Sequence, residues 1–127
     1  MEWTIRWGGD PEDVLATTFG DASLQDIAAF LADLLLDPAF RPGMSILVDH
    51  RETRFAPVTN DDVREVAKTL ESYAEQIGPA PVATVVDRQL DFGLSRMVHA
   101  LTDGQRAFEW QIFYDIDLAR EWLAQAD

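Results

Sequence analysis

Two short segments in the middle of the chain, Met44–Val48 and Val82–Val86, are apolar except for Ser45 and Thr84, and they constrain the fold more than any other feature. A strand that is apolar on both faces is typical of a parallel sheet whose two faces are covered. Segments with helical periodicity lie between and beyond these two strands. Strands that alternate with helices indicate parallel pairing through right-handed crossovers, so the chain is predicted to be an α/β protein.

Three further segments have the pattern of strands. Trp3, Ile5 and Trp7 alternate with polar residues, which indicates a half-buried strand, and an extended run from Val14 to Phe19 follows. These two segments are predicted to form an antiparallel pair. Large apolar residues alternate with polar ones between residues 108 and 114, so this strand is predicted to lie near an edge of the sheet.

Four amphipathic segments predict four helices, which end near Leu35, Ile77, Gly104 and Ala124. Their predicted N-terminal caps are Ser23, Thr59 or Asn60, Asp91 and Asp115. The predicted order of elements is ββαβαβαβα. Residues 1–127 are expected to form a single α/β domain, with a mixed, mainly parallel sheet of about five strands and about four helices.

Composition restricts the classes of function. The chain has 23 acidic and 10 basic residues and a net charge of −13, so it repels phosphate backbones, and no nucleic-acid partner is expected. A neutral or basic protein partner remains open. No apolar run reaches the ~20 residues needed to cross a bilayer, so no membrane insertion is expected. Cys is absent, which excludes disulfides and suits the cytoplasm, the predicted location.

Polar residues gather where the predicted strands end. Three strands run directly into an aspartate, at positions 49, 87 and 115. In parallel strands these positions share one edge of the sheet, and ligands of open α/β sheets bind at that edge. The candidate binding residues at the edge and beside it are Asp49, His50, Arg51, Arg54, Thr59, Asp87, Arg88 and Phe92.

A catalytic interpretation of this edge rests on Asp49 and His50. The carboxylate would fix the imidazole tautomer and raise its pKa, as in a general base of a hydrolase or isomerase. The alternative is structural, since polar residues reach water where strands end. No catalytic residue is assigned. No metal site is expected from only two His residues, His50 and His99, and the chain has no phosphate-binding loop, so no cofactor is predicted.

The chain resembles the STAS-related, SpoIIAA-like proteins of bacteria over nearly its whole length. The resemblance rests on the strand order, the strand end Leu47–Arg51, the helix start Phe92–Met97 and the terminal segment Ala119–Leu123. It implies a small mixed sheet backed by helices. For the better-known branch of these proteins it also implies a non-enzymatic regulator, an anti-sigma factor antagonist that binds a partner kinase.

The phosphorylation site of those regulators is not matched. Their phosphorylatable serine lies in an Asp-Ser-x-Gly turn, whereas Asp49 is followed here by His50, Arg51 and Glu52. Thr53 and Thr59 are the nearby hydroxyls. The resemblance therefore predicts the fold and does not carry over the phosphorylation switch.

Three functions remain open from sequence. The first is a non-enzymatic domain that binds a protein partner through the edge formed by residues 50–59 and 87–91. The second is a small-molecule or lipid-binding domain with an apolar pocket, lined by Phe55, Phe92, Met97 and Trp110. The third is the Asp49–His50 enzyme. A homodimer through the strand at residues 108–114 is a further prediction, because exposed strand edges invite pairing.

Overall fold

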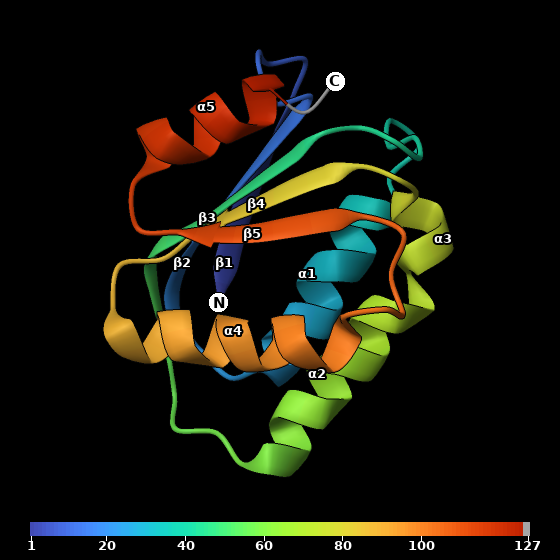
Figure 1. Cartoon of the computed structure of the whole chain (residues 1–127). Coiled ribbons are helices and arrows are strands. Elements are labelled where there is room, and N and C mark those ends of the chain that lie inside the picture. The colour runs from blue at the N-terminus through green and yellow to red at the C-terminus, as the bar shows by residue number, and fades with distance from the viewer. Residues whose placement is uncertain (126–127) are drawn as a thin grey trace.

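The computed structural model describes residues 1–125, in which one five-stranded sheet carries helices on both faces (Figure 1). The strands are β1 (Glu2–Trp7), β2 (Val14–Ala22), β3 (Ile46–Phe55), β4 (Pro81–Val85) and β5 (Glu109–Phe113). The helices are α1 (Gln25–Leu35), α2 (Asn60–Ser72), α3 (Ala74–Ile77), α4 (Gln89–Thr102) and α5 (Ile116–Gln125).

The strands lie in the order β1-β2-β3-β4-β5. β1 pairs with β2 in antiparallel fashion, and the pairs β2–β3, β3–β4 and β4–β5 are all parallel. This confirms the predicted mixed, mainly parallel sheet and the predicted N-terminal antiparallel pair. β5 lies at an edge of the sheet, as its alternating sequence predicted.

Helices α1 to α4 lie on one side of the sheet and α5 lies alone on the other (Figure 1). On the first side, Ile46, Val48 and Val82 pack against Phe30 and Leu34 of α1 in the larger part of the core. On the second side, a smaller cluster joins the alternate strand residues to α5; its buried members are Leu47, Ala83, Val85, Ala119 and Leu123. The two central strands are apolar on both faces because each face meets a helix layer.

The sequence predicted that β3 ends at Val48, and this prediction was wrong. β3 continues to Phe55, because its second half pairs with the second half of β2, as far as Ala22. The β2–β3 register shifts between Thr17 and Phe19. β4 pairs with β3 only as far as Asp49. A two-stranded extension of β2 and β3 therefore projects beyond the rest of the sheet.

Two of the predicted helix caps are present and two are not. Thr59 accepts the N–H of Asp62 and the Asp62 carboxylate accepts the N–H of Thr59, which completes a capping box on α2. Asp115 accepts the N–H of Asp117 at the start of α5. Ser23 does not cap α1, since its backbone N–H instead donates to Asp26. Asp91 does not cap α4, which begins two residues before it.

The helix predicted to run without a break from residue 60 to residue 77 is divided in two. α2 ends at Ser72, and Tyr73 separates it from the short helix α3. The Tyr73 ring is half-buried against the larger core cluster. Residues 1–125 therefore contain five helices, one more than the sequence indicated.

Candidate functional site

Four of the predicted binding residues line one polar depression at the carboxyl edge of the sheet. The depression has a volume of about 240 Å³, and its lining residues are Arg51, Glu52, Thr53, Arg54, Asp87 and Arg88. The extension of β3 supplies the first four, and the loop between β4 and α4 supplies the other two. The depression exists because β3 continues past the end of β4.

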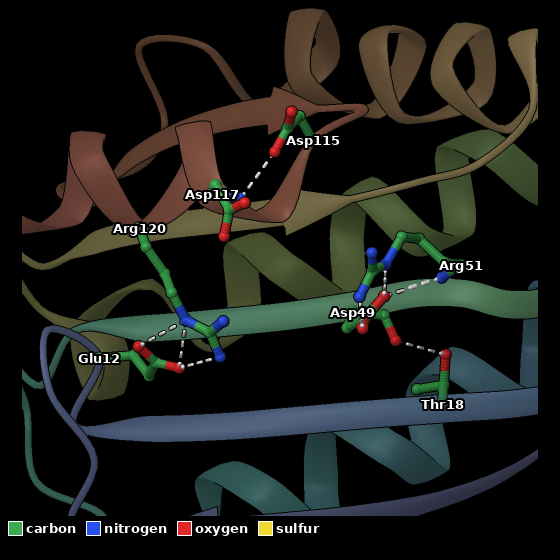
Figure 2. Close-up of polar contacts among 7 residues, drawn as sticks. All are labelled: Glu12, Thr18, Asp49, Arg51, Asp115, Asp117 and Arg120. Carbon is green, nitrogen blue, oxygen red and sulfur yellow. Dashed lines mark hydrogen bonds and ion pairs between the residues drawn. The ribbon is translucent and has the colours of Figure 1, made fainter.

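Asp49 and Arg51 form an ion pair within β3 (Figure 2). The two carboxylate oxygens of Asp49 accept hydrogen bonds of 3.0 Å from Nε and 2.9 Å from an Nη of Arg51, and the Arg51 N–H also donates to it at 3.0 Å. Burial of Asp49 opposes ionisation, but these hydrogen bonds outweigh it, so the pKa of Asp49 lies below its usual value. Asp49 is therefore ionised, and both of its carboxylate oxygens are bonded to Arg51.

His50 points to the opposite face of the sheet from Asp49, because neighbouring side chains alternate along a strand. Its Nδ1 lies 2.6 Å from Thr18 Oγ1, and its ring contacts Phe30 and Phe55 edge-on. Burial lowers the pKa of His50 to about 4, although Asp49 and Asp91 raise it in part. The imidazole is neutral at pH 7, and no Asp49–His50 hydrogen bond forms. The catalytic pair considered from sequence is thus not assembled.

Arg88 and Asp91 link the depression to the interior of the protein. The Asp91 side chain is 1 % exposed and accepts two hydrogen bonds of 2.9 Å from Arg88. An Nη of Arg88 also donates to the backbone carbonyl of Phe55 at 3.4 Å. The guanidinium thereby ties the start of α4 to the end of β3, and Asp91 acts as a buried partner of Arg88.

The remaining predicted residues lie outside the depression. Thr59 is exposed at the start of α2, where its hydroxyl is occupied in the capping box. Phe92 stacks on Tyr114 with 4.6 Å between the ring centroids. Thr53, the nearby hydroxyl within the depression, is only 2 % exposed and contacts Thr18 Oγ1.

An apolar cavity of about 110 Å³ lies beneath the depression, between the sheet and helices α1, α2 and α4. Its lining is mostly aliphatic, and its polar and aromatic residues include His50, Phe55, Thr84, Asp91, Ser95 and Trp110. Of the four residues that the sequence predicted to line an apolar pocket, two line this cavity. Phe55 and Trp110 line the cavity, whereas Phe92 stacks on Tyr114 and Met97 is 44 % exposed.

Two residues of this region, Thr18 and Thr84, were not identified from sequence as part of it. Thr18 contacts both His50 and Thr53, but its place opposite them depends on the β2–β3 register shift, for which the sequence has no signal. Thr84 accepts a hydrogen bond of 2.9 Å from Trp110 Nε1 and is the one hydroxyl in an otherwise apolar strand. That isolated polar residue in a buried segment is a signal that sequence reasoning can use.

Residues 1–125 contain no cluster of three or more His, Asp or Glu side chains placed to hold a metal ion. Within the same range, none of the helices combines the length and apolar character that a membrane crossing requires.

No model of a protein family matches the chain, and no curated protein matches it. Among solved structures, the chain is similar to an uncharacterized protein of the DUF3478 family with a SpoIIAA-like fold from Shewanella loihica PV-4. The TM-score is 0.57 at 16% sequence identity, and the match covers 96% of this chain and 92% of that one. The chain therefore has the SpoIIAA-like fold, which confirms the resemblance seen in the sequence. At this identity the likeness concerns the fold alone.

Proposed function

We propose that this chain is a non-enzymatic SpoIIAA-like regulatory domain that binds a protein partner through the carboxyl edge of its sheet. The observation that carries the proposal is the polar depression, where three arginines and two acidic residues meet on one side of a strongly acidic chain. Arg54 is its central group. This arginine is exposed and forms no ion pair with any residue between 1 and 125.

The charges around the depression suit a protein interface. Arg51 and Arg88 are held by Asp49 and Asp91, whereas Arg54 is free to bind a carboxylate of a partner. Glu52 and Asp87 offer the opposite charge at the same edge. A mixed pattern of charges fixes the orientation of a partner and disfavours proteins that would place like charges against it. The net charge of −13 favours a neutral or basic partner at long range.

Apolar and aromatic groups flank the same edge. Leu90 is 56 % exposed in the first turn of α4, and Tyr114 is 50 % exposed where β5 ends. Tyr114 is held in place by its stacked contact with Phe92. Exposed Tyr and Arg side chains beside an apolar residue are characteristic of the centre of a protein interface.

Charge reversal at Arg54 tests the proposal. Arg54→Glu places a third acidic group beside Glu52 and Asp87, and the affinity for the partner should fall by about ten-fold or more. The matched control is Arg6→Glu, because Arg6 is also an exposed strand arginine but lies opposite Leu15, toward the other end of the sheet. Equal losses in both variants, or an unchanged affinity in Arg54→Glu, would contradict the proposal.

A further inference from the structure

One nitrogen of His50 has no hydrogen-bond partner within residues 1–125. Thr18 occupies Nδ1, whereas Nε2 is bonded to no described residue. No side-chain nitrogen or oxygen in this range is both sealed from solvent and unpaired, so Nε2 must face an open space. His50 is only 8 % exposed and is one of the residues that line the apolar cavity, from which we infer that Nε2 faces that cavity.

The hydrogen bonds of the Thr18 hydroxyl determine whether His50 Nε2 is a donor or an acceptor. The one proton of the Thr18 hydroxyl can go to His50 Nδ1 or to another neighbour, and Thr53 Oγ1 also lies within hydrogen-bond distance. Nε2 therefore faces the cavity as a donor in one arrangement and as an acceptor in the other. A ligand hydroxyl both donates and accepts, so it can pair with Nε2 in either tautomer.

The size of the cavity limits the ligand. A cavity of ~150 Å³ lined by Leu, Ile and Phe is known to hold one benzene molecule. At about 110 Å³, the present cavity accommodates a body no larger than a single small ring, and a long acyl chain does not fit. The small-molecule alternative is thus favoured over the lipid alternative.

The charges around the cavity exclude an anion. The carboxylate of Asp91 lines the cavity, and its counter-ion Arg88 is bound to it from the side of the depression. Within the described part of the chain, no Lys or Arg lines the cavity itself. An anionic ligand would lose its hydration and meet a carboxylate without gaining a cation.

We propose that this cavity is a binding site for a small, neutral, hydroxylated molecule of about the size of one ring, such as a phenol or a short alcohol, with its hydroxyl bonded to His50 Nε2. The Thr84 hydroxyl, which accepts from Trp110, provides a second polar contact on the same wall. This site lies beneath the depression, and its occupancy does not depend on the partner proposed for that surface.

The test uses phenol as the probe, toluene as its isostere without a hydroxyl, and benzoate as its anionic counterpart. The imidazole nitrogens of the whole protein are followed by long-range ¹H–¹⁵N NMR during each titration. Phenol should move the Nε2 signal of His50, and benzoate should leave it in place. His99 is the internal control, because its Nε2 already lies 2.7 Å from the Trp110 carbonyl oxygen.

His50→Phe then removes the ring nitrogen and keeps an aromatic ring in the same position. The ratio of phenol affinity to toluene affinity should fall by about ten-fold, the usual effect of one hydrogen bond. An unchanged ratio in a folded His50→Phe protein would overturn the assignment. A His50 Nε2 signal that does not respond to saturating phenol in the wild-type protein would overturn it without any variant, and would mean that Nε2 pairs only with water.

Discussion

Acidification from about pH 7.5 to about pH 5.5 should destabilise the protein through His50. The pKa of His50 is lowered to about 4 in the folded protein and is 6.5 in a free side chain. Below pH 6.5 the unfolded chain therefore takes up a proton that the folded chain does not bind until the pH nears 4. The stability that neutral His50 contributes is complete above its unfolded pKa and is lost as the pH falls toward its folded pKa.

The expected loss from this one residue over that interval is about 1.4 kcal/mol in the free energy of unfolding. Urea unfolding followed by tryptophan fluorescence measures this free energy at each pH. His50→Phe is the matched variant, because it removes the titrating group and leaves His99 and the acidic residues unchanged. The wild-type protein should lose about 1.4 kcal/mol more than the variant on acidification. An equal loss in both proteins would show that His50 is not buried in its neutral form.

Three substitutions test other contacts of the fold by the same urea method. Thr59→Ala removes the capping box with Asp62 and should cost about 1 kcal/mol. Arg120→Ala leaves the buried Glu12 carboxylate, which accepts a bond of 3.1 Å from Arg120 (Figure 2), without its cation, and should cost about 2 kcal/mol. Leu47→Ala opens a cavity in a fully buried position beneath α5 and should cost about 3 kcal/mol. A change below about 0.5 kcal/mol in any of them would contradict the role assigned to that contact.

The elements with strong local patterns were predicted correctly from sequence. Val82–Val86 is apolar except for Thr84, and β4, which contains Val82–Val85, lies between two neighbouring strands and two helix layers. Thr59, one of the two residues predicted to cap α2, is its cap, and Asp62 completes a capping box with it. In both cases the sequence segment itself contains the physical cause of the structure.

The errors concern contacts between segments distant in sequence. β3 continues to Phe55 because β2 offers a partner as far as Ala22, and no local feature of β3 reveals that partner. Asp91 has the sequence context of a helix cap, but its carboxylate is bound by Arg88 in the folded protein. The position of Thr18 against His50 follows from a register shift that only the assembled sheet defines.

The homodimer through β5 stays a prediction. β5 lies at an edge of the sheet, so it can accept another strand. Thr59 is exposed, but its hydroxyl is part of the capping box, and phosphorylation there would remove that contact.

Site-specific photo-crosslinking in cells of the organism whose genome encodes the protein tests the proposed partner-binding edge most directly. A photo-crosslinking amino acid with an apolar side chain replaces Leu90, which flanks the depression, in one protein, and Leu36, at the C-terminal end of α1, in a second one. Both side chains are exposed, and Arg54 is left in place in both proteins. The account predicts a discrete crosslinked protein from position 90 and none from position 36. Crosslinks of equal intensity from both positions, or no crosslink from position 90, would contradict it.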